Sequence, residues 1–341
     1  MKIAILGAGL SGLAVAWNLL HLEPLIPSLE VVVFDEHGVG GGASGVAAGL
    51  LHCFGGARSK LNWRGLEGLK ETGILLEKSA AALGKPVLVN QKGILRPAVN
   101  TEQKADFMLC AARYSDQVSW LARDAAEAVF AEMAPGAVAS EALWIRDGLV
   151  VDLPNYLEGL WRGCAARGAR LIRTHMHSLE DLLDFDVRVV AVGGGLSHFS
   201  ELGSAYQSRV RGVKGQIVEL TWPSDSPPLQ AALNSAAYLV MQAHGASCFL
   251  GATYERDYAN CLPDPEVALC YLLPKGNALF PGLKESTLID CRAGIRAVTS
   301  NHLPFIEKTP YPATWVIGGM GSKGLLYHAL LAKELVQKML Y

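Results

Sequence analysis

Hydrophobic and polar positions along this chain follow two alternating periods, one typical of buried strands and one typical of amphipathic helices. The first twenty residues, MKIAILGAGLSGLAVAWNLL, carry a single charged side chain, Lys2. One interpretation is a secretory signal, with a positive start, an apolar core and a cleavage site at Ala14-Val15-Ala16. The other is a buried strand over 2–6, a glycine-rich turn over 7–12 and a helix to about Leu20. The rest of the chain has to decide between them.

The remaining pattern predicts a mixed α/β fold. Short β-branched or glycine-terminated apolar runs predict strands over 29–34, 169–173, 187–195 and 314–319. The helical period predicts helices over 61–83, 102–133, 155–167 and 325–340. Alternating or short strand-like patterns, suited to an antiparallel sheet, occupy 86–100 and 209–254.

The order of these elements predicts two domains. Strand–helix–strand segments of the parallel type lie at both ends and near the middle of the chain, with antiparallel segments between them. We therefore expect a Rossmann-type, glutathione-reductase-like nucleotide-binding domain with an inserted α+β domain built on an antiparallel sheet. The expected boundaries are 1–85, 150–205 and 290–341 for the first domain, and 86–149 and 206–289 for the second.

Three glycines in the first turn, Gly7, Gly9 and Gly12, have the G-x-G-x-x-G spacing of a dinucleotide-binding loop. That spacing alone is a weak signal, but each glycine has a physical purpose. The first makes the turn, the second lets the backbone approach a pyrophosphate, and the third lets the helix and the strand pack closely. The helix N-terminus then faces the negative charge of the phosphates.

An acid at the end of the next strand is the expected partner of this loop, because it binds ribose hydroxyls. Asp35 directly follows the strand VVVF, 23 residues after Gly12, and a loop with Pro24 and Pro27 accounts for the slightly long interval. Cleavage after Ala16 would remove the strand and all three glycines and leave Asp35 without a partner. The start of the chain is therefore predicted to be a phosphate-binding loop and not a signal.

Two further glycine-rich segments favour a flavin over a nicotinamide. Residues 40–49, GGGASGVAAG, follow Asp35 and contain no charge. A flexible surface loop would explain them, but a flavoprotein needs small residues there, where the chain passes the pyrophosphate and the isoalloxazine edge. Residues 319–324, GMGSKG, precede the last helix; a helix cap would explain Ser322. The whole segment suits the flavin pyrimidine ring better, because its N–H groups and the helix dipole would stabilise negative charge there.

The amino-acid composition argues against several classes of partner and site. Half of the 341 residues are apolar and 18% are charged, which is typical of a globular protein with two domains or one large α/β unit. The net charge of −2 gives no general attraction to nucleic acid or anionic membrane. The seven scattered cysteines contain no C-x-x-C pair, which favours reduced thiols and a cytoplasmic location. We expect neither a membrane segment nor a metal site, since no ligand spacing for a metal is visible.

Six motifs, taken in order, give the chain a resemblance to a known family. They are GAGLSG, FDE, GASGVAAGLL, VVAVGGG, AGIRAVTSNHLP and GGMGSKGL. This set resembles the D-amino-acid oxidase superfamily of FAD enzymes, which includes glycine oxidase and sarcosine oxidase. Within it, residues 251–257, 296–304 and 321–325 are most similar to the C-terminal oxidase domain of the tRNA wobble-uridine enzyme MnmC, whereas 47–51 are more similar to glycine oxidase.

The resemblance implies which residues bind FAD. It assigns the ADP half to Gly7, Gly9, Gly12 and Asp35. It assigns the pyrophosphate and the flavin to Ala43, Ser44, Ala47, Ala48, Gly49 and Leu50, and the flavin ring to Gly319, Gly321, Ser322, Lys323 and Gly324. Met176 is a weaker candidate near the adenine, and Gly193 belongs to the glycine turn beside the first strand.

The resemblance also implies a substrate site. Arg296 falls where glycine oxidase and D-amino-acid oxidase keep the arginine that binds the substrate carboxylate, and a guanidinium can hold a carboxylate by two hydrogen bonds. A structural ion pair is the alternative for Arg296. Tyr238, Tyr254 and His52 are candidates for the pocket wall; ordinary sheet aromatics and a hydrogen-bonded structural histidine are their alternatives. No catalytic side chain is assigned, because the hydride passes directly to the flavin.

Two departures from sarcosine oxidase bear on the chemistry. Its flavin is attached to a cysteine at the position held here by Arg296, and Cys291 lies five residues away, so we expect noncovalent FAD. Its oxygen-activating lysine corresponds to Phe249, which leaves the electron acceptor open.

The leading functional hypothesis is an FAD-dependent oxidoreductase acting on CH–NH or CH–NH₂ donors, with a small amine or amino acid as substrate and O₂ as acceptor. The first alternative is removal of the carboxymethyl group from a tRNA wobble uridine, which would need a basic face. Two basic clusters bear on this alternative: Arg58, Lys60, Arg64 and Lys70 around Trp63, and Arg209, Arg211 and Lys214. The tRNA alternative is strengthened if both clusters border one pocket and weakened if they lie on opposite faces of the molecule. The second alternative is a flavin-binding redox protein without turnover.

Overall fold

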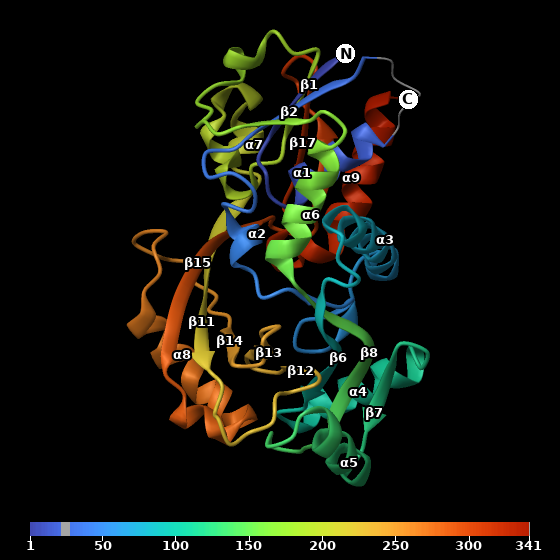
Figure 1. Ribbon diagram of the computed structural model, residues 1–341, viewed down its shortest axis with the longest axis vertical. Coiled ribbons are helices and arrows are strands. Elements are labelled where there is room, and N and C mark those ends of the chain that lie inside the picture. Colours follow the sequence, from blue (N-terminus) through green and yellow to red (C-terminus); the bar gives the residue numbers. More distant parts are fainter. Residues whose placement is uncertain (22–27, 341) are drawn as a thin grey trace.

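A computed structural model describes residues 1–21 and 28–340, so the prolines Pro24 and Pro27 lie outside the described residues. Two β-sheets organise the chain (Figure 1). The strand order of the first sheet is β16-β17-β10-β1-β2-β9. Its strands are β1 (Lys2–Leu6), β2 (Glu30–Phe34), β9 (Arg170–Ile172), β10 (Val187–Val190), β16 (Phe305–Lys308) and β17 (Thr314–Gly318). Neighbours pair in parallel, except that β16 runs antiparallel to β17, and this arrangement confirms the Rossmann-type prediction.

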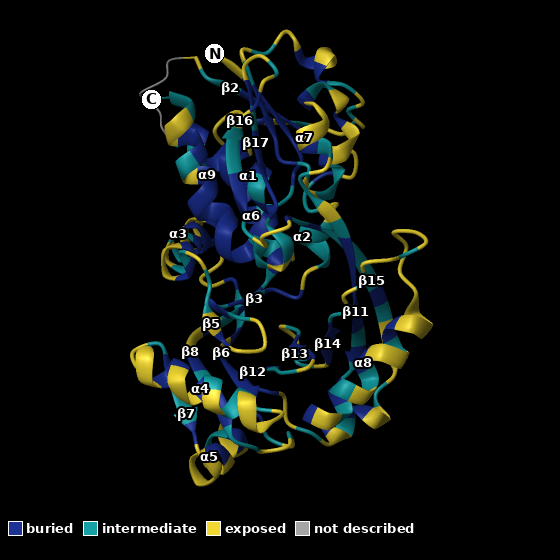
Figure 2. Cartoon of the chain, turned by 180° about the vertical axis from the view of Figure 1, so that it is seen from behind, coloured by how far each residue is buried: buried dark blue, intermediate teal, exposed yellow. Residues whose placement is uncertain are grey.

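The central strands β1, β2, β10 and β17 of the first sheet are largely buried on both faces, which explains their mostly apolar sequences. The edge strands β9 and β16 are partly exposed. Ile3 and Ile5 belong to one core, whereas Ala4 and Leu6 belong to another. The first core is formed with helices α1 (Leu10–Leu20), α3 (Gly65–Leu83), α6 (Leu153–Ala165) and α9 (Gly324–Leu340). The second is covered by α7 (Ser204–Gln207) and by 3₁₀ helices over 179–182, 193–198 and 200–202. The helix α1 and the first part of α9 are accordingly mostly dark in Figure 2, whereas the C-terminal end of α9 carries exposed and intermediate residues.

The second sheet is long and largely antiparallel, as the alternating pattern predicted. Its order is β15-β11-β14-β13-β12-β6-β8-β3, and β7 also pairs with β8. Among the described strand pairs of this second sheet, only β12 and β6 run parallel to each other. The strands are β3 (Leu50–Leu51), β6 (Val89–Pro97), β7 (Val118–Leu121), β8 (Ala142–Val151), β11 (Arg211–Thr221), β12 (Ala232–Asn234), β13 (Tyr238–Met241), β14 (Ser247–Gly251) and β15 (Leu288–Val298). A third core lies between this sheet and helices α5 (Arg123–Met133) and α8 (Pro265–Leu279).

Residues 102–133, expected to be mostly helix, do contain two helices, but a strand that was not expected separates them. The chain forms α4 (Thr101–Arg113), the strand β7 and α5. The sequence VSWL of β7 is rich in β-branched and aromatic residues, and Val118 and Leu121 are buried against β8. The strand β8 and the helix α8 were not expected either.

Short elements carry the chain from the first sheet to the second. They are α2 (Ala43–Val46), β3, β4 (Phe54–Gly55) and β5 (Lys60–Leu61). Although β3 falls in the expected range 1–85 of the first domain, it pairs with β8 of the second sheet. The division into domains at the boundaries given above stays a prediction.

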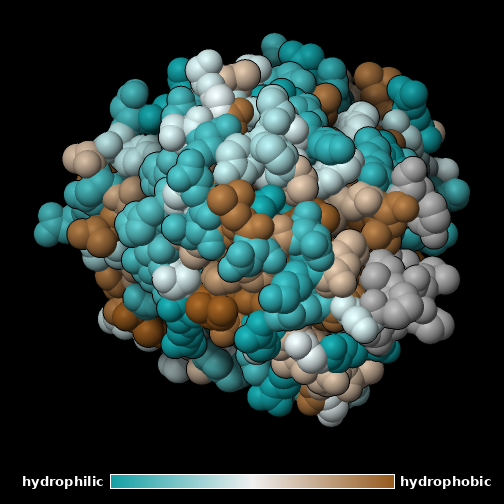
Figure 3. All heavy atoms as spheres, turned by 90° about the horizontal axis from the view of Figure 1, so that it is seen from above, coloured by the Kyte–Doolittle hydropathy of each residue, from teal (hydrophilic) through white to brown (hydrophobic). Residues whose placement is uncertain are grey.

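The surface at the end of the molecule that holds the first sheet is mostly hydrophilic, with scattered apolar patches (Figure 3). None of the helices in residues 1–21 and 28–340 combines the length and apolar character that crossing a bilayer requires.

Glycines let the helices of the first core approach closely, and α3 provides a matched test. A Cβ atom at Gly68 would overlap the carbonyl oxygen of Leu326 on α9, whereas a Cβ at Gly73 would meet no atom within 4 Å. We expect Gly68→Ala to lower the free energy of unfolding by about 1–3 kcal/mol through overpacking. Gly73→Ala should raise it by about 0.5–1 kcal/mol, because alanine is the better helix former. Denaturant unfolding followed by circular dichroism measures both, and equal effects of the two substitutions would contradict the packing.

A buried histidine on α9 predicts a pH dependence of stability. Burial lowers the pKa of His328 from 6.5 to about 4, although hydrogen bonds to the carbonyls of Gly324 and Leu325 oppose the shift. As the pH falls from about 6.5 to about 4, the unfolded chain takes up the proton and the folded chain does not, so stability is lost in that window. The loss attributable to His328 is about 3 kcal/mol.

The test compares unfolding free energies of the wild type and His328→Gln between pH 7 and pH 4. Glutamine can keep a hydrogen bond to the hydroxyl of Tyr156, which lies 2.7 Å from His328 Nε2. The wild type should lose about 3 kcal/mol relative to the variant. The exposed His198→Gln serves as the control. Parallel curves for the wild type and His328→Gln would show that the imidazole does not stay neutral in the folded protein.

Candidate functional site

The glycine loop after β1 has a shape that only glycine allows. Gly7 has a φ of +103°, and a Cβ atom there would lie 2.6 Å from the carbonyl oxygen of Ala191. A Cβ at Gly9 would lie 2.9 Å from Ser44 Oγ, and a Cβ at Gly12 would overlap the carbonyl oxygen of Gly7. The three glycines therefore bring the beginning of α1 against β1, β10 and the segment around Ser44.

The first turn of α1 presents peptide N–H groups to an anion. Gly9 precedes the helix without a side-chain cap, and the first turn contains no acidic residue. Leu10 N–H donates to Ser44 Oγ at 3.1 Å, whereas the N–H groups of Gly9 and Ser11 have no acceptor in the part of the chain that the structure describes. Free donors together with the helix dipole fit a pyrophosphate at this position.

Asp35 joins the glycine loop to the segment that follows β2. Its Oδ2 accepts a hydrogen bond from Ala8 N–H at 2.8 Å, and its Oδ1 accepts from the N–H groups of His37 and Gly38, both at 2.9 Å. A carboxylate offers about four lone-pair positions, so Asp35 retains acceptor capacity for ribose hydroxyls.

The segment predicted to line pyrophosphate and flavin runs from the glycine loop to the second sheet. Ala43 and Ser44 begin α2, and Ala47 and Ala48 follow it. Gly49 has a φ of +82° and its carbonyl accepts from Val151 N–H, after which Leu50 pairs with Val150. From the other side, a Cβ at Gly294 of β15 would lie 3.1 Å from Ala43 Cα. The second sheet therefore packs directly on this segment.

The C-terminal glycine segment reaches the same place. Gly319 and Gly321 have φ values of +71° and +55°, and residues 321–323 form a 3₁₀ helix that leads into α9. The segment contacts both neighbours of the site: Met320 forms a β-bridge with Val298 of β15, and a Cβ at Gly324 would lie 3.8 Å from Leu10. The predicted residues Ser322 and Lys323 belong to this turn, and burial lowers the pKa of Lys323. All three glycine-rich segments thus meet around the N-terminus of α1 and the end of β15.

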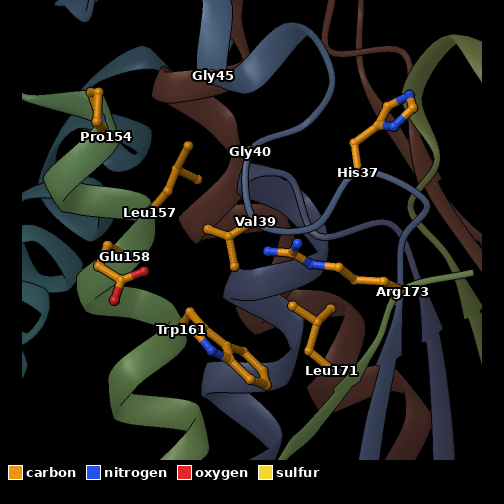
Figure 4. Close-up of a pocket in the computed structure, with 10 residues that line it drawn as sticks. All are labelled: His37, Val39, Gly40, Gly45, Pro154, Leu157, Glu158, Trp161, Leu171 and Arg173. Atoms are coloured by element: carbon orange, nitrogen blue, oxygen red, sulfur yellow. The ribbon is translucent and has the colours of Figure 1, made fainter.

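Two candidates lie at the edge of this region. Gly193 has a φ of +56° and begins the 3₁₀ helix after β10, while Met176 packs against the core that contains Phe34. A cavity of about 520 Å³ opens between the segment after Asp35, α6 and the end of β9 (Figure 4). It is lined by His37, Val39, Gly40, Gly45, Pro154, Leu157, Glu158, Trp161, Leu171 and Arg173, and Met176 does not line it.

The guanidinium of Arg296 lies on the second sheet without a carboxylate partner. A Cβ at Gly215, on the neighbouring strand β11, would overlap this guanidinium, so the side chain lies flat across the bare backbone of Gly215. Its Nη1 donates to the carbonyl of Thr253 at 3.1 Å, and no ion pair forms with any carboxylate among the described residues. Burial lowers the pKa of Arg296, and the structural ion pair considered above is absent from the described region.

Tyrosines and a histidine gather on the same face of the sheet. Tyr238 is opposite Gly251, and a Cβ atom added at Gly251 would lie 2.5 Å from the Tyr238 hydroxyl. Burial raises the pKa of Tyr238 to about 12, although the positive charge of Arg296 acts to lower it. The Tyr254 ring lies 5.9 Å from the Arg296 guanidinium and is 45% exposed, so it stands at the rim. His52 Nε2 lies 3.3 Å from Asn234 Nδ2, and burial, helped by the charge of Arg96, lowers the His52 pKa to about 3.

Residues missed by the sequence analysis complete this face. Gly215 makes room for Arg296, Thr253 orients it, and Asn234 contacts His52. Phe249 also has a cation beside it, since Arg292 stacks over the Phe249 ring at 4.9 Å and pairs with Glu219 at 3.1 Å. Thr253 lies in the stretch 251–257 quoted above, but its contact with Arg296 and the place of Gly215 beside Arg296 follow only from the pairing of β11 with its neighbours.

The second basic cluster lies only partly on the surface. Lys214 is 4% exposed and lies beside β15, whereas Arg211 is exposed. Arg209 pairs with Glu307, and Arg64 of the first cluster pairs with both Glu67 and Glu334. In Figures 1 and 2, α3, which carries Lys70, and β11, which carries Arg211 and Lys214, lie on opposite sides of the molecule. No residue of the first cluster lines the cavity that Lys214 lines.

Comparison with known proteins agrees with this geometry. The sequence profile of the family described as FAD dependent oxidoreductase (DAO) matches residues 2–338. The chain is 25% identical over 372 residues to the tRNA 5-methylaminomethyl-2-thiouridine biosynthesis bifunctional protein MnmC of Polaromonas naphthalenivorans, with 99% of this chain and 56% of that protein covered. It is 24% identical over 370 residues to the glycine oxidase of Geobacillus kaustophilus, with 98% and 93% covered.

The fold agrees as well. The crystal structure of glycine oxidase from Geobacillus kaustophilus superposes with a TM-score of 0.81 at 23% identity, over 99% of this chain and 95% of that chain. The chain spans only about half the length of the MnmC relatives that it matches. The profile match over nearly the whole chain and the fit of the glycine-rich segments to a dinucleotide lead to one conclusion. The chain belongs to the DAO family of FAD-dependent oxidoreductases, and FAD is its cofactor.

Proposed function

We propose that this protein oxidises the C–N bond of a free amino acid or N-substituted glycine to an imine, which water then hydrolyses. Bound FAD supplies the hydride acceptor for this reaction, and we assign O₂ as the final acceptor, which gives hydrogen peroxide. The observation that carries the proposal is the partly buried guanidinium of Arg296, which has no carboxylate partner among the described residues and lies near the segment that begins at Ala43. Removing a charge from water without giving it a partner is costly, and the carboxylate of the substrate would supply that partner.

Arg296 would orient the substrate by a two-point hydrogen bond to its carboxylate. Thr253 already occupies one Nη1 donor and holds the guanidinium flat over Gly215, which leaves the outward donors free. Tyr238 keeps its proton at neutral pH because its pKa is about 12, so its hydroxyl is able to donate to a substrate oxygen. The exposed ring of Tyr254 would cover the entrance.

For the cofactor we propose the roles given by the motifs. Gly7, Gly9, Gly12 and Asp35 would bind the ADP half, and residues 43–50 would line the pyrophosphate and the flavin. The segment from Gly319 to Gly324 would face the flavin ring, with Met176 and Gly193 at the edge of the adenosine site.

Noncovalent attachment of FAD is supported by the direction of Cys291. This residue is buried, and its Sγ contacts Gln216 at 3.9 Å. It lies five positions from Arg296 on β15, and successive side chains of a strand alternate between faces. Cys291 therefore points away from the face that carries Arg296.

A tRNA-borne substrate is the second candidate, favoured by the similarity to MnmC proteins. The electrostatics weaken this candidate. The two basic clusters lie on opposite sides, Lys214 is buried, and the charges of Arg58, Arg64 and Arg209 are each paired with carboxylates. Neutralised arginines release fewer counterions from a polyanion, so they add little affinity for nucleic acid.

Anaerobic titration of the purified flavoprotein discriminates the candidates. Bleaching of the oxidised flavin band by glycine, sarcosine or a D-amino acid is the expected outcome. Bleaching only by tRNA that carries a carboxymethylaminomethyl uridine would favour the second candidate and refute the first. Binding of either class without bleaching would make the protein a flavin-binding module without turnover.

Removal of the Arg296 charge should abolish most substrate binding. Truncating one partner of a buried, hydrogen-bonded charge pair costs about 2–5 kcal/mol, so Arg296→Met should lower kcat/KM about 30- to 4,000-fold. The flavin spectrum should persist, because the predicted FAD contacts lie elsewhere. Arg211→Met, an exposed arginine at the start of β11, is the matched control and should leave kcat/KM unchanged. A loss of less than threefold for Arg296→Met would refute the carboxylate-binding role.

Two glycines on facing strands should separate substrate binding from flavin binding. Gly215→Ala would displace the Arg296 guanidinium, and an overpacking cost of about 1–3 kcal/mol corresponds to a KM increase of about 5- to 150-fold. Gly294→Ala would instead press on Ala43 and should weaken retention of FAD during gel filtration. If both substitutions changed only the flavin content, the position assigned to Arg296 would be wrong.

A further inference from the structure

A second cavity lies on the back of the sheet that carries Arg296. It has a volume of about 640 Å³ and opens between β11, the loop over 255–264 and the first turn of α8. Val213 is opposite Arg296 in the register of β11 with β15, whereas Lys214 is opposite Ile295. Because successive side chains alternate between faces, Lys214 and Gln216 point away from Arg296 and into this cavity. The loop that covers it lies at the outer edge of the molecule (Figures 1 and 2).

Lys214 is a buried cation without a partner. It is 4% exposed and lines the cavity, and its ammonium group has neither a hydrogen-bond acceptor nor an ion-pair partner among residues 1–21 and 28–340. Burial of an unpaired ammonium destabilises a fold unless some acceptor offsets the lost hydration. The lysine also has no role in the reaction proposed above, since the sheet separates it from Arg296.

Carboxylates face the lysine without neutralising it. Glu255 Oε1 accepts from Thr253 Oγ1 and from Gln216 Nε2, and Asp264 Oδ1 accepts from the N–H of Val267. The second oxygen of each carboxylate has no hydrogen bond among the described residues, and neither carboxylate forms an ion pair with Lys214. The remaining wall includes a third acidic residue, Glu266, and the apolar residues Leu262, Pro263 and Pro265.

We propose that this cavity binds a free zwitterionic amino acid. The carboxylate of the ligand would accept from the Lys214 ammonium, and its own ammonium would donate to the free oxygens of Glu255 and Asp264. A simple anion would satisfy Lys214 but would meet the repulsion of the carboxylates, and a simple amine would leave Lys214 unpaired. A molecule with both charges satisfies each group, and the apolar wall accommodates its side chain.

The cavity and the reaction site share one segment. Lys214 and Glu255 exchange two backbone hydrogen bonds of 3.0 and 2.9 Å. Across the same pair of segments, Thr253 N–H donates to the carbonyl of Gln216 and Gln216 N–H donates to Thr253 Oγ1. The carbonyl of Thr253 accepts from Arg296 on the other face. A ligand that fixes Glu255 would therefore also fix the acceptor that orients Arg296, so the KM of the substrate should fall when the cavity is occupied.

The test measures binding by calorimetry in the FAD-loaded Arg296→Met variant, so it does not depend on turnover or on the proposed function. Glycine and L-leucine are the probes, with acetate and methylamine as the two half-molecules. We expect one site per chain, with an affinity for the amino acid about tenfold or more above that for either half-molecule. Adding Lys214→Met should weaken binding about tenfold or more, and Glu255→Gln should act similarly, whereas the exposed Lys284→Met should not.

Thermal unfolding separates a ligand site from a structural lysine. Methionine has nearly the shape of the lysine stem, so Lys214→Met should keep or raise the melting temperature if the ammonium is unpaired. A lower melting temperature together with unchanged binding would mean that Lys214 is structural and would overturn the proposal. Absence of binding to Arg296→Met, or equal affinity for acetate and amino acids, would overturn it as well.

Discussion

The register of β11 against β15 is the constraint on which both sites depend. In that register Gly215 lies beside Arg296, so the guanidinium can rest on bare backbone, and Gly294 meets Ala43 of the flavin-binding segment. A shift of one residue would exchange the faces of every side chain on the strand. It would place Lys214 beside the flavin segment and bury Arg296 under α8. The bulge between Glu219 and Leu220 limits the regular pairing at one end, and the bridge from Val298 to Met320 limits it at the other.

Each face of the same sheet holds one cation that has no ion pair among the described residues, and the two have different surroundings. Arg296 contacts the carbonyl of Thr253 and the ring of Tyr254, and the nearby charge of Glu255 favours its charged form without forming an ion pair. Lys214 shares its cavity with acidic side chains, which would repel a simple anion. A ligand that binds Lys214 through a negative group therefore also needs a positive group to offset these carboxylates. The contrast follows from position: the front face borders the flavin segment, which carries no charge between Gly40 and Gly49, whereas the back face borders the charged turn before α8.

Local patterns predicted the central strands of the first sheet, because these strands are largely buried and because glycine directly follows β1 and β17 and Asp35 directly follows β2. The partly exposed edge strand β16 was not predicted. Gly7, Gly12 and Asp35 act within one strand–helix–strand unit, so their spacing is visible in the sequence. The strand β7 was missed because VSWL is a four-residue interruption of a long amphipathic pattern. Gly215 and Lys214 could not be interpreted without the pairing of β11 with β15, which joins residues about 80 positions apart. The sequence shows a lysine near two arginines but gives no sign that this lysine is buried.

Similarity to both glycine oxidase and MnmC is consistent with a site that recognises only the glycine part of a substrate. Arg296 would bind the carboxylate of a free amino acid and of an N-substituted glycine in the same way, so the residues that touch the reacting atoms do not distinguish the two. Discrimination must come from what lies outside the rim marked by Tyr254. A nucleic acid would need unpaired cations at this rim. Arg64, however, makes two ion pairs on the other side of the molecule, and Lys214 is buried and lines the cavity on the back of the sheet. The surroundings of the site, more than its centre, therefore favour a small free amine.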